Sequence, residues 1–112
     1  MNLEIIGRHV EITPDVREFV AQRVEKLGKF FDRVHSLKVV IAVEGTNHRA
    51  EFVAHLVKSD TVVSRGSAAD VYGAVEIAAD KLEHQLRRYK EKLRNHRAKQ
   101  EEEPSEGGAQ EA

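Results

Sequence analysis

The sequence predicts an α+β fold in the order β-α-β-β-β-α, with a four-stranded mixed sheet and two helices packed on one face of it. Three observations predict this fold. Two segments repeat apolar residues at helical spacing, so each has one apolar face to bury. Four shorter segments are rich in β-branched residues and are bounded by turn residues. One sheet covered by both helices would bury all of these apolar faces together.

The first strand and the first helix are predicted within the N-terminal 27 residues. The strand covers residues 3–6 and is followed by Gly7 as a breaker. Thr13-Pro14-Asp15 predicts a helix start, because a hydroxyl can cap free N–H groups, proline needs no donor there and an acid suits the helix dipole. The helix is expected to run to Leu27, and its crossover should place the first two strands parallel.

Three consecutive antiparallel strands are expected next, at residues 37–44, 49–57 and 61–67. The first is β-branched or apolar at nearly every position, which is typical of a central strand. Residues 45–48 are turn-forming, and Lys58-Ser59-Asp60 separates the last two strands.

A long second helix is predicted from Asp70 to about Arg97. Its apolar stripe is formed by Val71, Val75, Ala78, Leu82, Leu86, Tyr89 and Leu93. Residues 100–112 contain five Glu and no large apolar residue, so they cannot bury enough surface to offset the entropy of ordering. We therefore expect one domain over residues 1–98 and a disordered acidic tail over residues 99–112.

The bulk composition limits the compartment and the size of the protein. A chain of 112 residues suffices for one compact domain. It has no cysteine, which is compatible with a reducing compartment, and no signal-peptide pattern or long apolar run. We expect a cytoplasmic protein that does not contact a membrane.

The formal charge of -1 conceals a separation of charge along the chain. All 18 Lys and Arg lie at or before Lys99, together with 14 of the 19 acids, so residues 1–99 carry +4 and the remainder carries −5. Residues 87–99 hold seven cationic side chains against Glu91 alone. An anionic partner is the natural inference.

The basic side chains are expected to form an RNA-binding surface, since cations on a rigid helix can reach phosphates. At about 100° per residue, one flank of the second helix carries Lys81, His84, Arg88 and Lys92, and the other carries Arg87, Lys90 and Arg94. The first helix adds Arg23, Lys26 and Lys29. Arg23 falls within the apolar stripe, so we expect it either to extend along the helix edge or to emerge between the helices and join Lys81 and Arg88 in one patch.

Catalytic and metal chemistry are not predicted. The six histidines include no H-x-H or H-E-x-x-H spacing, and no phosphate-binding loop or nucleophile elbow is present. We expect no cofactor, no small-molecule substrate and no enzymatic activity. Tyr72 and Tyr89 could stack on bases, although Tyr89 lies in the apolar stripe and is expected to pack in the core.

Several segments resemble the ribosome hibernation promoting factors, in consistent order over residues 1–96. In the first half they are Val10-Glu11-Ile12-Thr13, Arg17-Glu18-Phe19-Val20, Lys26-Leu27, Phe31-Asp32-Arg33 and Val39-Val40-Ile41. In the second helix they are Asp70-Val71-Tyr72, Asp80-Lys81-Leu82-Glu83, Gln85-Leu86 and Lys90-Glu91-Lys92-Leu93.

The resemblance implies a domain that binds ribosomal RNA in the mRNA and tRNA channel of the small ribosomal subunit. Occupancy of that channel would inhibit translation in stationary phase or stress by steric exclusion. Residues matching the family's basic pattern are Arg23, Lys26, Lys29, Lys81, Arg88 and Lys92. His84 stands where the family pattern suggests arginine, so that contact is either lost or sensitive to pH.

The family also leaves the effect on ribosome dimers open. The chain lacks the second domain of long-form members and resembles the short form, which acts with ribosome modulation factor to favour dimers. Its acidic tail instead resembles the extension of ribosome-associated inhibitor A, which opposes dimers.

Two other functions are compatible with the residues. The long second helix could pair with a partner helix, although a coiled coil would carry charges of both signs beside its seam. A generic double-stranded RNA binder would bind any long duplex with a steep salt dependence.

Overall fold

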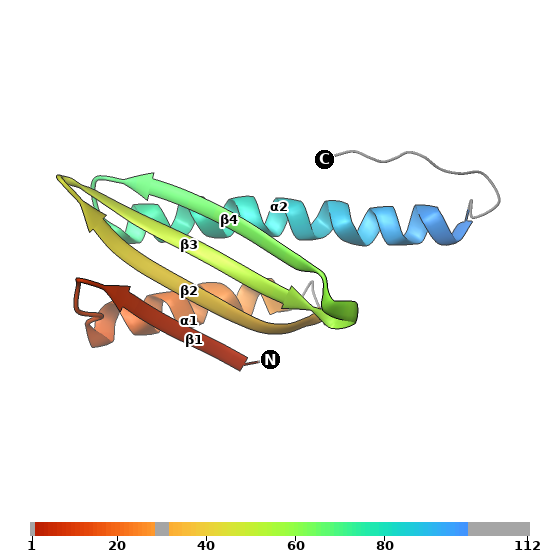
Figure 1. Cartoon of the computed structure of the whole chain (residues 1–112), viewed down its shortest axis with the longest axis horizontal. Helices are drawn as coiled ribbons and strands as arrows, with labels where there is room; N and C mark the ends of the chain where they lie inside the picture. The colour runs from red at the N-terminus through yellow and green to blue at the C-terminus, as the bar shows by residue number, and fades with distance from the viewer. Residues whose placement is uncertain (1, 29–31, 99–112) are drawn as a thin grey trace.

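The computed structural model describes residues 2–28 and 32–98, with the side chains of 28 and 93–98 left out. In chain order the elements are β1 (Asn2–Arg8), α1 (Pro14–Gly28), β2 (Val34–Glu44), β3 (Asn47–Leu56), the short 3-10 turn η1 (Val57–Ser59), β4 (Thr61–Ala68) and α2 (Val71–Ala98) (Figure 1). The predicted order β-α-β-β-β-α is confirmed. Lys29 and the acidic tail fall outside the described residues.

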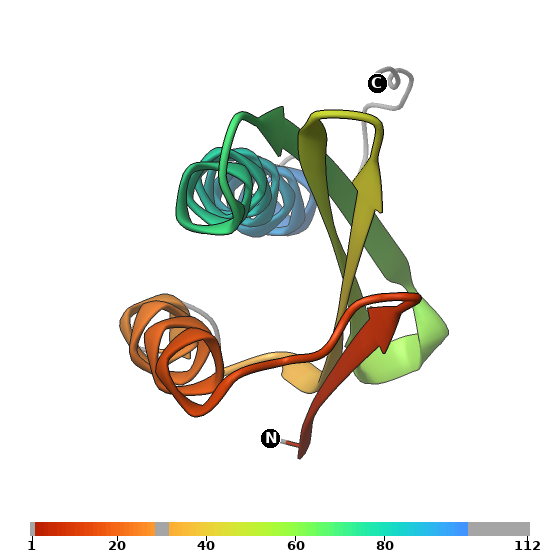
Figure 2. The same cartoon turned by 90° about the vertical axis from the view of Figure 1, so that its left-hand side faces the viewer.

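The four strands form one sheet in the order β1-β2-β3-β4. β1 pairs in parallel with β2, whereas β2–β3 and β3–β4 are antiparallel. Figure 2 shows both helices on one face of the sheet, with the other face left open. The prediction of a mixed sheet with two helices on one face is therefore confirmed.

Both helices begin with the side-chain caps that their sequences provide. Thr13 Oγ1 accepts a hydrogen bond from the Val16 N–H at 3.2 Å, before α1. Asp70 Oδ1 accepts one from the Gly73 N–H at 2.8 Å, before α2. Each cap satisfies a donor that the first helical turn leaves free.

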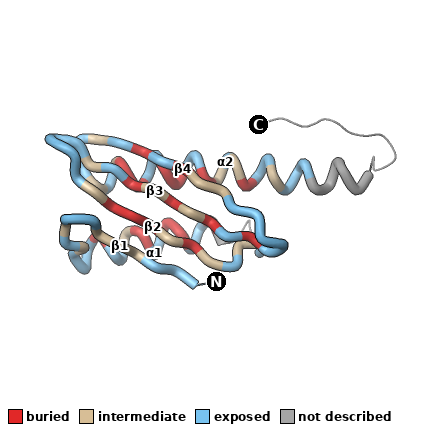
Figure 3. The backbone as a smooth tube through the Cα atoms, in the orientation of Figure 1, coloured by how far each residue is buried: buried red, intermediate tan, exposed pale blue. Residues whose placement is uncertain are grey.

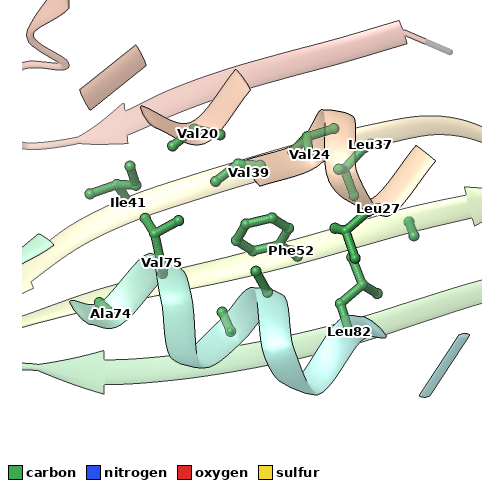
Figure 4. Packing of buried hydrophobic residues seen from close by; sticks show 14 of the residues in the cluster. Val20, Val24, Leu27, Leu37, Val39, Ile41, Phe52, Ala74, Val75 and Leu82 are labelled. Atoms are coloured by element: carbon green, nitrogen blue, oxygen red, sulfur yellow. The ribbon is translucent and has the colours of Figure 1, made fainter. Parts of the chain in front are cut away.

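The core lies between the sheet and the two helices. Phe52 of β3 is fully buried at its centre, with Val39 and Ile41 of β2 beside it. Figure 4 shows Val20 of α1 and Leu82 of α2 reaching into this cluster from the helix layer. Figure 3 shows the same division along the strands, where buried residues alternate with more exposed ones.

The contact between α2 and β4 is unusually close. Ser64 Oγ donates a hydrogen bond to the Ala78 carbonyl oxygen at 2.8 Å. A Cβ atom at Gly66 would lie 2.6 Å from the Ala78 nitrogen and 2.7 Å from the Ala74 carbonyl oxygen. The strand can approach the helix backbone this closely only because position 66 has no side chain.

Candidate nucleic-acid interface

The candidate interface is carried by α2, whose C-terminal part extends past the sheet (Figure 1). Its early turns are held between β4 and the core by Ala74, Ala78 and Leu82. The basic side chains that follow therefore belong to a helix whose first turns are packed against the core. Such a helix keeps cationic groups at fixed spacing while their long side chains remain free to move.

One flank of α2 carries four exposed basic side chains, which we call the cationic ridge: Lys81, His84, Arg88 and Lys92. At about 100° per residue, Lys81, Arg88 and Lys92 lie roughly 140–180° around the helix from Glu83. Between Val71 and Lys92, the acidic residue beside this flank is Glu91, which follows Arg88 by three residues and His84 by seven. Within the described part of the chain, no ion pair involves a ridge residue.

Arg23 lies between the two helices, where it contacts the flank of α2 opposite the ridge. Its Nε donates to Glu76 Oε1 at 3.0 Å, and its Nη2 donates to Asp80 Oδ1 at 2.7 Å and Glu83 Oε1 at 3.3 Å. Only 9% of the residue is exposed. The prediction that Arg23 joins Lys81 and Arg88 in one patch is therefore wrong, because α1 lies against the acidic flank of α2.

The charge of Arg23 is held firmly by this environment. Burial would lower the pKa of its guanidinium, but the hydrogen bonds to Asp80, Glu76 and Glu83 raise that pKa above its ordinary value. The three carboxylates outnumber the two arginines that pair with them, Arg23 and Arg87. A phosphate approaching Arg23 would meet negative charge first, so the geometry gives Arg23 the role of joining α1 to α2.

The sequence did contain a signal for this arrangement. Glu76, Asp80 and Glu83 are spaced i, i+4 and i+7, which places them on one helical face. An arginine within the apolar stripe of a neighbouring helix is the matching partner. The positions of the basic residues alone do not reveal this pairing, because it depends on the three acids.

The remaining basic residues lie on the Arg23 side of α2 or on α1. Arg87 Nη2 pairs with Glu83 Oε2 at 2.8 Å. Lys90 is exposed on the same flank as Arg87, and Lys26 is exposed on α1 one turn after Arg23. The Arg94 side chain and Lys29 lie outside the described residues. The structure thus separates the predicted basic residues into two groups on opposite flanks of α2.

Both tyrosines are held by contacts within the protein. Tyr89 Oη donates a hydrogen bond to Asp60 Oδ2 at 2.6 Å, which together with burial raises the pKa of the phenol. The Tyr72 ring packs edge-on against Phe19 with ring centroids 5.0 Å apart. Tyr89 is only half-buried and contacts the core cluster, as predicted.

Replacing Arg23 with alanine is expected to lower the free energy of unfolding by about 2–3 kcal/mol, because three charge-assisted hydrogen bonds between the helices are lost. The exposed fractions of the Glu76 and Asp80 side chains, 48% and 71%, keep the loss below that of a fully buried pair, since water can solvate them. Urea denaturation measures the change.

Arg23→Lys serves as the matched variant, since it keeps the charge but cannot span several carboxylates at once. It should recover less than half of the lost stability. Full recovery by lysine would show that charge alone, without the guanidinium fork, joins the helices.

Metal binding and membrane insertion find no support in the described residues. No group of three or more His, Asp or Glu side chains there is placed to hold a metal ion. Among the same residues, no helix is both long and apolar enough to cross a bilayer.

The chain matches the model of the Sigma 54 modulation protein / S30EA ribosomal protein family over residues 3–94. The ribosome hibernation promoting factor of Escherichia coli (strain K12) is 38% identical over 96 residues, which cover 86% of this chain and 100% of that relative. The protein of the same name from Azotobacter vinelandii is 34% identical over 92 residues, which cover 82% of this chain and 85% of the relative.

Two solved structures of similar fold carry related names. The Thermus thermophilus Protein Y N-terminal domain superposes with a TM-score of 0.72 at 34% identity, covering 80% of this chain and 99% of that one. A ribosomal subunit interface protein from Coxiella burnetii superposes with a TM-score of 0.76 over 80% of this chain and 98% of that one, and at 22% identity it shows the fold alone. The chain therefore belongs to the Sigma 54 modulation protein / S30EA ribosomal protein family, and the predicted resemblance to the ribosome hibernation promoting factors is confirmed.

Proposed function

We propose that this chain binds ribosomal RNA of the small subunit in the mRNA and tRNA channel and inhibits translation by occupying that space. Membership in a family of non-enzymatic ribosome-binding proteins supports a ribosome-associated role in hibernation and translation regulation. The observation that carries the RNA-binding proposal is the cationic ridge, whose side chains are exposed and lack internal ion pairs in the described part of the chain.

The ridge suits phosphate binding for three physical reasons. Lys81, Arg88 and Lys92 are spaced seven and four residues apart, so they form a row about 16 Å long at 1.5 Å per residue. Lysine approaches a phosphate as a point charge, whereas arginine can bind two of its oxygens at once. Within the described residues, these cations form no ion pair, so RNA binding breaks no ion pair of the folded domain.

The second flank is proposed to contact a separate RNA segment. Arg87 and Lys90 lie on the side of α2 that faces α1, and Lys26 belongs to α1 itself, so one straight phosphate backbone cannot meet them and the ridge together. Lys29 and Arg94 are proposed to extend this second group. Two contact regions would favour a folded RNA cleft over an isolated duplex.

Inhibition on this proposal needs occupancy alone. A protein held by many phosphate contacts excludes mRNA, tRNA and initiation factors from the same space, with no bond made or broken. The protein would act in the cytoplasm, where ribosomes work.

A sucrose-gradient profile of a stationary-phase lysate containing the tagged chain tests this proposal. We expect the chain to sediment with fractions that contain small subunits, and the same profile reports whether ribosome dimers accumulate. A chain that stays at the top of the gradient would overturn the proposal. Equal affinity for purified small subunits and for a long RNA duplex would instead indicate a generic double-stranded RNA binder.

A further inference from the structure

The strongest unexplained feature of the chain is the opposite charge of α2 and of the segment that follows it. Residues 100–112 contain five Glu and no Lys or Arg. The family match ends at residue 94, so this segment lies beyond the shared domain. We propose that residues 100–112 bind back onto the cationic ridge of the same molecule and must be displaced when RNA binds; this inference rests on the proposed function of the ridge.

Charge complementarity favours the ridge over the other flank as the binding surface. The flank facing α1 already contains Glu76, Asp80 and Glu83, which pair with Arg23 and Arg87. A second acidic segment placed there would gain less, because these carboxylates already offset the neighbouring cations. On the ridge flank between Val71 and Lys92, Lys81, Arg88 and Lys92 face one acidic neighbour, Glu91, so cations are in excess there and added carboxylates gain most.

The segment begins in the right place and is long enough. It follows the C-terminal end of α2, so a chain that folds back meets Lys92 first and Lys81 last. Lys92 lies six residues before Ala98, about 9 Å along the helix, and Lys81 lies about 26 Å away. A chain spans at most about 3.3–3.6 Å per residue, which gives about 17 Å for the five residues from Ala98 to Glu103 and about 45 Å for the thirteen to Glu111. Glu101 to Glu103 can therefore reach Lys92 and Arg88, and Glu111 can reach Lys81.

Residues 100–112 can compete with RNA for the ridge because they belong to the same chain. Each exposed pair is weak by itself, but a short tether holds the carboxylates at millimolar effective concentration beside the ridge. RNA displaces them because its phosphates are more densely spaced. An RNA that offers only a few phosphates to the ridge would displace the segment poorly. The protein would therefore bind such RNA more weakly than it binds the small subunit.

The test replaces all five glutamates of the full chain with glutamine: Glu101, Glu102, Glu103, Glu106 and Glu111. The dissociation constant for purified small subunits should fall about five- to tenfold at low salt, because the competitor is removed. The gain should shrink as salt approaches about 0.2 M, where exposed pairs are screened. A variant with aspartate at the same five positions is the control and should bind as the parent does.

A second background separates the ridge from a general change in net charge. When Lys81→Gln and Arg88→Gln are already present, the five glutamine substitutions should change affinity less than twofold. An undiminished gain in that background, or parental affinity in the five-glutamine variant itself, would overturn the inference.

Amide chemical shifts decide the inference even if small subunits are not bound at all. Without RNA, the glutamine variant should shift the amide signals around Arg88 and Lys92 and leave those around Lys38 unchanged. Identical spectra would refute the contact. Failure to bind small subunits with these shifts present would count against the proposed function alone.

Discussion

Replacing Lys81 and Arg88 together with glutamine is expected to lower the affinity for the small subunit about 100-fold, roughly tenfold for each lost phosphate contact. The slope of log affinity against log salt should become shallower by about two, one for each contact. The free energy of unfolding should stay within about 0.5 kcal/mol of the parent, because both side chains are exposed and glutamine is a comparable helix former. Binding titrations at several salt concentrations measure both effects.

A matched control removes two positive charges from the other face of the protein. Lys38 of β2 alternates with the buried Leu37 and Val39, and Arg8 of β1 pairs in parallel register with Ala42. Both side chains therefore belong to the face of the sheet opposite the helices. Arg8→Gln with Lys38→Gln should reduce affinity less than threefold, through net charge alone. If both double variants lose affinity equally, binding depends on total charge and the ridge has no special role.

Most of the fold followed from patterns that act locally along the chain. The cap at Thr13 and the helical spacing after it located α1, since these signals depend on neighbours only a few residues away. Strand boundaries were less accurate: β2 begins at Val34, three residues before its predicted start. The β2–β3 register shifts between Val34 and Ser36, and such an irregular end leaves little trace in a period-two pattern.

The apolar run of β2 indicated a central strand correctly, but its two faces differ. Leu37, Val39 and Ile41 face the helices and are buried. The opposite face has no helix over it. Even so, only 8% of Val40 on that face stays exposed. Neighbouring side chains across the sheet can therefore bury an apolar residue without a covering layer.

The site was predictable only in part, because a sequence pattern assigns residues to helix faces but not helices to each other. The ridge residues were grouped correctly, since they share one flank of one helix. Whether Arg23 faced that flank depended on which side of α2 receives α1. Glu76, Asp80 and Glu83 fit that side by charge, and only an analysis of both signs of charge together could have shown it.

The closeness of α2 to β4 is a second feature that sequence patterns do not show, and Gly66→Ala tests it. The new methyl group would sit 2.6 Å from the Ala78 nitrogen and 2.9 Å from the Ile77 Cβ, distances at which backbone must move. The free energy of unfolding should fall by about 3 kcal/mol, at the upper end of the cost of overpacking, because the obstacle is helix backbone and cannot rotate away. In an open strand position the same change would instead stabilise slightly.

Ser67→Ala, one residue along the same strand and exposed, is the control and should change stability by less than about 0.5 kcal/mol. Affinity supplies the second half of the test. A helix shifted by a fraction of an ångström still presents Lys81, Arg88 and Lys92 on long mobile stems, so the folded fraction of the Gly66→Ala variant should bind small subunits almost as the parent does. The two variants should therefore behave in opposite ways. Gly66→Ala should lose stability and keep its affinity, whereas the Lys81 and Arg88 double variant should lose affinity and keep its stability. A Gly66→Ala protein as stable as its parent would show that α2 can move away from β4 at little cost.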